Sequence, residues 1–246
     1  MGRIESCFEN LQSKGEKGLI TFITAGDPSI ENTLDYMQSL VDGGADIIEL
    51  GVPFSDPMAD GPTIQRASER SLAAGTDLSS IFMLVRTFRE RNASTPVILM
   101  GYMNPFERLG FEKFAKDASE SGVDGVLVVD LPPEESAQQN KILTANGIRQ
   151  VFLVAPNSSK DRIKKVGELA AGFIYYVSVK GVTGDKSISI SNIQKSLELV
   201  RSGTSLPIGL GFGIKTPESA REAAKLSDAV VVGSALVDII EKEVEV

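Results

Sequence analysis

The sequence predicts a single (β/α)8 barrel of the TIM-barrel class, because three of its features fit that fold together. Eight short apolar runs recur in 246 residues, at spacings of about 30 residues, the usual length of a βα unit. Most runs are continuously apolar, as parallel strands covered on both faces are. Segments of helical period lie between them. With no linker in the chain, the simplest arrangement is one barrel domain over 1–246.

The expected strands are the apolar runs themselves. They span 19–24, 46–51, 96–101, 124–130, 150–154, 172–178, 207–211 and 228–233. A doubly wound open sheet is the alternative arrangement of the same elements. It would show a glycine-rich fingerprint after the first strand, and the run Thr24-Ala25-Gly26-Asp27-Pro28 is not one.

The expected helices follow the strands in order. They span 30–43, 63–73 with 78–91, 106–121, 133–146, 159–170, 191–201, 217–226 and 235–243. In the first of them Ser29 is a candidate N-cap, and Gly43 with Gly44 is a stop signal. An extra N-terminal helix is expected over 1–13, where it would cover the bottom of the barrel.

Composition excludes several classes of protein. The formal net charge is −8 and there is no basic stripe, so we expect no nucleic-acid partner. The N-terminus has no apolar signal core, and no apolar run approaches membrane-spanning length. The single cysteine, Cys7, has no internal partner for a disulfide. These features predict a cytoplasmic protein.

The chain contains no histidine. A Ser-His-Asp triad, a Cys-His pair and histidine-ligated metal sites are therefore excluded. Acid–base chemistry near neutral pH would fall to Glu, Asp, Tyr or Lys side chains whose pKa is shifted by burial.

The segment 47–65 places two acids in informative surroundings. Glu49 lies near the end of an apolar run, where burying a charged carboxylate is costly. A loop rich in proline and aspartate follows, and its Asp60 comes eleven positions after Glu49. One interpretation is a hydrogen-bonded core acid and a capped turn. The other is a pair of acids, one on a strand end and one on a loop that folds back over it.

Three glycine-bearing turns follow the last three expected strands and are candidates for a phosphate site. They contain Gly181 to Gly184, Gly211 to Gly213, and Gly233 with Ser234. In barrels the loops after the seventh and eighth strands often bind phosphate with a helix N-terminus. Glycine lets backbone N–H groups approach an anion, although each turn alone is explained equally well by backbone geometry.

The segment 47–65 resembles the signature of the tryptophan synthase alpha subunit family. The resemblance continues through 22–28, 130–132, 181–184, 211–213 and 232–235. It implies a lyase that cleaves indole-3-glycerol phosphate to indole and glyceraldehyde 3-phosphate. Glu49 would be the acid that protonates C3 of the indole ring and then acts as a base. Asp60 would accept a hydrogen bond from the indole N–H group.

The resemblance also implies binding residues. Those of the indole slot are Phe22, Met100, Leu127, Tyr175 and Phe212, with Tyr102 near its mouth. Thr183, in a loop that resembles the mobile lid of the family, would bond Asp60. Those of the phosphate site are Gly184, Gly213, Gly233 and Ser234. Relatives often have an arginine just before the lid run, where this chain has Val179 and Lys180.

A beta subunit is the partner that the resemblance implies, in an α2β2 assembly. That subunit would carry pyridoxal phosphate and receive the indole, whereas no cofactor or metal is expected on this chain. The loop from Pro53 to Asp60 and the region of Asn104 would contact it. A free-standing lyase, a phosphate-binding barrel isomerase and a non-catalytic regulatory subunit are the alternatives.

Overall fold

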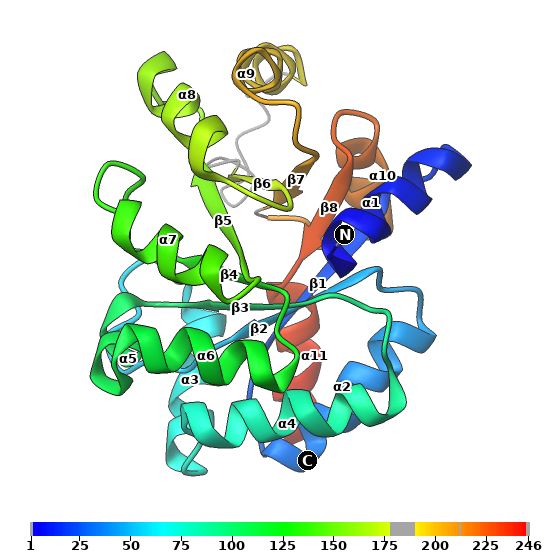
Figure 1. Cartoon of the computed structure of the whole chain (residues 1–246). Helices are drawn as coiled ribbons and strands as arrows, with labels where there is room; N and C mark the ends of the chain where they lie inside the picture. Colours follow the sequence, from blue (N-terminus) through cyan, green and yellow to red (C-terminus); the bar gives the residue numbers. More distant parts are fainter. Residues whose placement is uncertain (1, 178–189, 212, 245–246) are drawn as a thin grey trace.

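A closed barrel of eight parallel strands forms the centre of the molecule (Figure 1). The computed structural model describes residues 2–177, 190–211 and 213–244. The strands follow one another around the barrel in chain order, and β8 closes it by pairing with β1, where Ile20 lies opposite Val231. The predicted (β/α)8 barrel is therefore confirmed.

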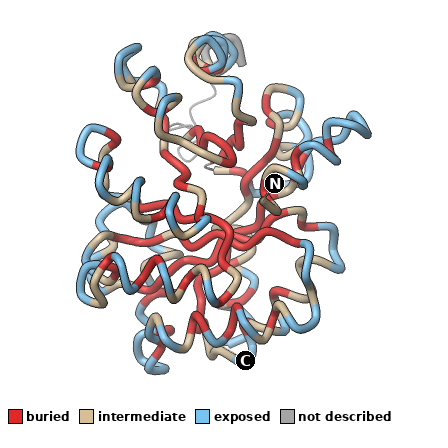
Figure 2. The backbone as a smooth tube through the Cα atoms, in the orientation of Figure 1, coloured by how far each residue is buried: buried red, intermediate tan, exposed pale blue. Residues whose placement is uncertain are grey.

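Each strand lies where an apolar run predicted it, with ends that differ by a residue or two. The strands are β1 Gly18–Thr24, β2 Ile47–Gly51, β3 Val97–Gly101, β4 Gly125–Val128, β5 Arg149–Val154, β6 Ile174–Val177, β7 Ile208–Gly211 and β8 Ala229–Val232. Buried residues concentrate on these strands, and exposed residues on the outer faces of the helices (Figure 2).

The helices surround the barrel. They are α1 Arg3–Lys14, α2 Ile30–Asp42, α3 Pro62–Ala73, α4 Leu78–Arg91, α5 Met103–Leu109, α6 Phe111–Ser121, α7 Ala137–Ala145, α8 Lys160–Leu169, α9 Ile190–Gly203, α10 Pro217–Ala224 and α11 Ser234–Val244. Ser29 caps α2 by accepting from the N–H of Asn32, as predicted. No helix in the described ranges combines the length and hydrophobicity that crossing a membrane requires.

Two helix predictions are wrong in their extent. The helix expected over 106–121 is divided into α5 and α6, because Gly110 has φ 86° and ψ 120°, outside the helical region. The helix expected over 133–146 begins only at Ala137. Before it, the N–H of Glu135 donates to the carbonyl of Pro132 at 3.0 Å, which closes a turn instead of a helix.

The N-terminal helix α1 covers the bottom of the barrel, as predicted. Its side chains Ile4, Phe8 and Leu11 are buried in one apolar cluster with residues of the barrel interior. Gly125 leaves room for Ile4, because a Cβ atom at position 125 would lie 3.1 Å from Cδ1 of Ile4. This cluster closes the N-terminal end of the barrel, so access to its interior is from the other end.

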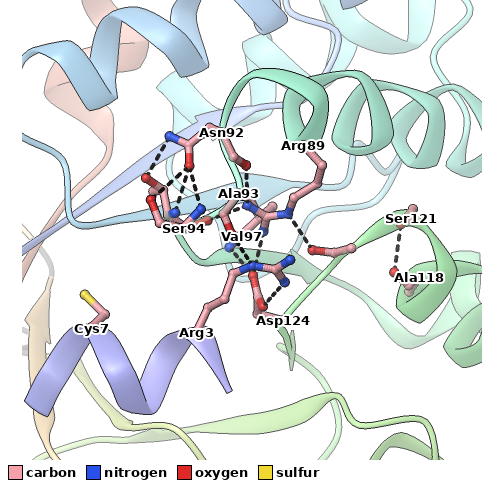
Figure 3. A network of polar contacts seen from close by, with 12 residues as sticks. Arg3, Cys7, Arg89, Asn92, Ala93, Ser94, Val97, Ala118, Ser121 and Asp124 are labelled. Atoms are coloured by element: carbon pink, nitrogen blue, oxygen red, sulfur yellow. Dashed lines mark hydrogen bonds and ion pairs between the residues drawn. The ribbon is translucent and has the colours of Figure 1, made fainter. Parts of the chain in front are cut away.

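An ion network joins α1 to the strands at this closed end (Figure 3). The Asp124 carboxylate accepts from the Val97 N–H at 2.8 Å and pairs with Arg89 at 2.6 Å and Arg3 at 2.8 Å. Arg89 also donates to the carbonyl oxygen of Gly122 at 2.9 Å. Burial lowers the pKa of Arg89 to about 10, although the charge of Asp124 opposes this effect. The network holds β3, β4, α1 and α4 together without touching the open end.

Candidate active site

A cavity of about 360 Å³ opens at the C-terminal end of the barrel. Its size is typical of a site for a small molecule. The cavity is lined by Phe22, Ala59, Asp60, Gly61, Pro62, Thr63, Ile64, Met100, Val129, Leu153, Tyr175, Val177, Gly213, Ile214, Lys215, Val231, Gly233 and Ser234. In (β/α)8 enzymes active sites lie at this end of the barrel.

Glu49 is a fully buried acid beside this cavity. It lies on β2 with 0% of its surface exposed, and its neighbour in register on β1 is Phe22, which lines the cavity. Among the described residues, neither carboxyl oxygen has a hydrogen-bond partner. Burial, and secondarily the negative charge of Asp60, raise the pKa of Glu49 from 4.5 to about 8. The side chain therefore holds a proton at neutral pH and exchanges it close to neutrality.

Asp60 lines the cavity and is held by three hydrogen bonds. The hydroxyl of Tyr102 donates to its Oδ2 at 3.0 Å. The backbone is fixed because the Asp60 N–H donates to the carbonyl of Pro57 at 3.0 Å and the Gln65 amide donates to the Asp60 carbonyl at 2.9 Å. Burial raises the pKa of Asp60, and the bond from Tyr102 opposes that rise.

Helix α3, which follows Asp60, is anchored on α11 (Figure 1). The Thr63 hydroxyl donates to the Asp238 carboxylate at 2.9 Å. One turn further along α3, Arg66 makes two hydrogen bonds of 2.6 Å to the Glu241 carboxylate. These contacts hold the start of α3 against α11. Because Asp60 lies just before α3, they also limit where Asp60 can move.

Tyr175 is a buried tyrosine of the cavity wall. Its ring comes from β6 and lines the cavity. Burial raises the pKa of its hydroxyl well above the ordinary value, and negative charge on Glu49 and Asp60 raises it further. The hydroxyl therefore keeps its proton at neutral pH.

Most of the predicted slot residues in the described part of the chain lie around this cavity. Phe22, Met100 and Tyr175 line it, and Tyr102 borders a small adjoining space together with Asp60. Leu127 is fully buried next to these residues, since it lies opposite Met100 on the neighbouring strand, and its role in the slot stays a prediction. Thr183, Gly184 and Phe212 lie outside the described residues.

Several apolar lining residues were not predicted from the sequence. They are Ile64, Val129, Leu153, Val177, Ile214 and Val231. Except for Ile64, they lie within three residues of the C-terminal end of a strand. The rule that barrel sites form at strand C-termini would have found those five, whereas Ile64 reaches the cavity from the first turn of α3.

The candidate phosphate residues lie along the wall formed by the last two strands. Gly213, Gly233 and Ser234 all line the cavity. Gly213 has φ 76°, a left-handed conformation that favours glycine. Ser234 begins α11, and the N-terminus of a helix attracts anions. Lys215, which was not predicted from the sequence either, is an exposed residue that lines the same part of the cavity.

A metal ion has no candidate site within the described ranges, since no group of three or more His, Cys, Asp or Glu side chains there is arranged to hold one. The described lining residues instead include one carboxylate, Asp60, one lysine, Lys215, and the glycine turns at Gly213 and Gly233, with the acid of Glu49 beside them.

Comparison with known proteins identifies the family. The model of the tryptophan synthase alpha chain family matches residues 8–246. This chain belongs to the tryptophan synthase alpha chain family. Membership confirms the family that the segment 47–65 predicted.

Members of the alpha chain family resemble this chain over nearly all of its length. The tryptophan synthase alpha chain of Paraburkholderia phytofirmans is 53% identical over 242 residues, which is 98% of this chain and 90% of the relative. A crystal structure of subunit alpha from Legionella pneumophila gives a TM-score of 0.94 at 42% identity, covering 100% of this chain and 91% of that one. A structure of the Pyrococcus furiosus α2β2 complex gives 0.85 at 40%, covering 92% and 90%.

Proposed function

We propose that this chain is the alpha subunit of a tryptophan synthase and splits indole-3-glycerol phosphate into indole and glyceraldehyde 3-phosphate. The observation that carries the proposal is Glu49, a fully buried acid with a pKa raised to about 8. It lies beside a cavity that Asp60 lines. In this retro-aldol reaction C3 of the indole ring gains a proton, a glycerol hydroxyl loses one, and the carbon–carbon bond between ring and glycerol breaks.

Glu49 would carry the proton transfers. Protonation at C3 makes the indole ring a good carbon leaving group, and a carboxyl that is protonated at neutral pH can donate that proton. The resulting carboxylate then removes the proton of the glycerol hydroxyl, which becomes the aldehyde as the bond breaks. Because Glu49 is buried in the absence of substrate, we expect its side chain to turn toward the cavity when the substrate enters.

Asp60 would stabilise the charge that develops during this step. The protonated indole ring is cationic, and its N–H group is an enhanced donor. A carboxylate fixed by Tyr102 at 3.0 Å is arranged in advance to accept that hydrogen bond, and such preorganised electrostatic stabilisation is commonly the largest contribution to catalysis.

The other walls would bind the rest of the substrate. Phe22, Met100 and Tyr175 line the cavity and would offer an apolar surface to the indole ring. Gly213 and Ser234 also line it, and their N–H groups would bind the phosphate. The substrate would then span the cavity, with its ring beside the acids and its anionic end beside β7 and β8.

A beta subunit is the partner that the Pyrococcus furiosus α2β2 complex suggests. We propose that it docks on the loop from Pro53 to Asp60 and the region of Asn104, and that it carries the pyridoxal phosphate that uses the indole, with no cofactor on this chain. Met58 in this loop is 87% exposed, and methionine is common at adaptable interfaces. We also propose that residues 1–246 form one domain and that the protein acts in the cytoplasm.

An indole-release assay tests the proposal. The unaltered chain should form indole from indole-3-glycerol phosphate, and faster when a beta subunit is added. Asp60→Asn and Glu49→Gln should each lower kcat by at least roughly 10²-fold, the low end for loss of a general acid or base. Near-normal indole release by either variant would refute the assignment. A purely regulatory subunit would activate its partner equally well with Asp60→Asn, and a free-standing lyase would not respond to the partner.

A further inference from the structure

Lys215 is a charged cavity residue that the proposed reaction has not yet used. We propose that its ammonium group attracts the phosphate of the substrate and raises affinity for anionic substrates, an inference that rests on the proposed function. Lys215 would therefore be a binding residue that selects the phosphorylated substrate and takes no part in proton transfer.

The local structure places Lys215 on the phosphate wall. It follows Gly213 by two residues, and both line the cavity. The next residue, Thr216, is the N-cap of α10 and forms a capping box with Ser219, in which the Thr216 N–H donates to the Ser219 hydroxyl at 3.1 Å. The backbone of Lys215 is thus held between a glycine turn and a capped helix. The flexible stem of the side chain leaves its charge free to follow an anion.

The cavity has a negatively charged residue in one loop and a positively charged residue in another. Among the described lining residues, the charged side chains are Asp60 and Lys215. Asp60 belongs to the loop after β2, whereas Lys215 belongs to the loop after β7. A substrate with a cationic transition state at one end and a phosphate at the other matches this arrangement.

The net charge of the chain makes a local cation useful. At a formal charge of −8 the protein as a whole repels a phosphate dianion. Backbone N–H groups at Gly213, Gly233 and Ser234 carry only partial charges, so a full positive charge beside them offsets the repulsion. Two unit charges about 4 Å apart in water attract enough for roughly a fivefold gain in affinity, and a dianion raises this to roughly 30-fold.

Three variants test the inference in the indole-release assay at low ionic strength. Lys215→Met keeps the apolar stem and removes the charge, and Lys215→Arg keeps the charge. The matched control is Lys225→Met, which removes one charge from the far end of α10, where Lys225 pairs with Glu222 at 2.6 Å. We expect Lys215→Met to raise KM roughly 5- to 30-fold with little change in kcat. Lys215→Arg and Lys225→Met should keep KM near that of the unaltered chain.

Salt provides a second measurement. In about 1 M salt the Debye length falls to about 3 Å, so the difference in KM between Lys215→Met and the unaltered chain should largely disappear. Calorimetric titration with inorganic phosphate should show weaker binding to Lys215→Met than to Lys225→Met at low salt.

Several outcomes would overturn the role of Lys215. They are an unchanged KM in Lys215→Met at low salt, an equal rise in Lys225→Met, and a fall in kcat with KM constant. Failure of the proposed function looks different, because the unaltered chain would then release no indole. Phosphate titration still reports on Lys215 in that case.

Discussion

The buried carboxyl of Glu49 has no hydrogen-bond partner among the described residues. We therefore predict that this side chain lowers the stability of the folded protein at neutral and alkaline pH. In the folded state its pKa is raised from 4.5 to about 8, first by burial and then by the charge of Asp60. Between these two pH values the folded state keeps a proton that the unfolded state has already lost. Unfolding then releases a proton, so raising the pH favours the unfolded state. Proton binding by Glu49 contributes fully to the free energy of unfolding only below about pH 4.5, and this contribution is lost as the pH rises toward 8.

The size of the effect follows from the same two pKa values. Each pH unit within this window costs about 1.4 kcal/mol of unfolding free energy. The loss is therefore about 3 kcal/mol at pH 7 and about 4 kcal/mol at pH 8. Glu49→Gln has nearly the same shape and no charge to desolvate. It should be more stable than the unaltered chain by roughly these amounts, although we expect it to have lost most of its activity.

Urea unfolding of Glu49→Gln and of the unaltered chain at pH 5, 6, 7 and 8 measures this difference in stability directly. The control is Glu9→Gln, which changes an exposed glutamate on α1. The difference in unfolding free energy between Glu49→Gln and the unaltered chain should grow with pH, whereas Glu9→Gln should run parallel to the unaltered chain. A constant difference for Glu49→Gln, or a loss of stability at pH 7, would refute the reasoning that Glu49 is protonated in the folded state.

Three further predictions concern single side chains. Tyr102→Phe removes the hydroxyl bonded to Asp60 and should lower kcat roughly tenfold in the indole-release assay with little change in KM; an unchanged kcat would contradict the positioning role of Tyr102. Asp124→Ala leaves the largely buried Arg89 without its carboxylate partner and should cost roughly 3 to 5 kcal/mol in urea unfolding, and a cost below about 1 kcal/mol would show that the network is dispensable. Burial raises the pKa of the Cys7 thiol to about 11, so its reaction with a disulfide reagent at pH 8 should be at least roughly 10²-fold slower than that of free cysteine; comparable rates would contradict this.

The fold was predictable because its signal repeats. Each strand is buried on both faces and therefore appears in the sequence as a continuous apolar run, and errors in single boundaries leave the order of elements unchanged. The helix predictions failed where backbone conformation overrides periodicity. Gly110 takes a conformation that ends α5, and hydrogen-bonded turns replace the expected start of α7. Apolar periodicity alone contains no information on either feature.

The candidate site was predictable where a residue is unusual for its surroundings. An acid inside an apolar strand marks Glu49, and a match of the segment 47–65 to a known signature marks Asp60. Lys215 gave no such signal, because a single lysine in a loop is ordinary, and only the closed barrel brings it to the cavity wall. Leu127, which the resemblance assigns to the slot, is buried in one cluster with Tyr175 and Met100, and both of these line the cavity. Its role in the slot stays a prediction.

A crystal structure of Asp60→Asn with indole-3-glycerol phosphate bound is the most direct test of the claim that two acids act on one ligand. We expect the ring N–H beside position 60, the Glu49 carboxyl turned toward C3 of the ring, and the phosphate against Gly213 and Ser234. A ring bound away from both acids, or a Glu49 carboxyl still buried with substrate in place, would contradict the account.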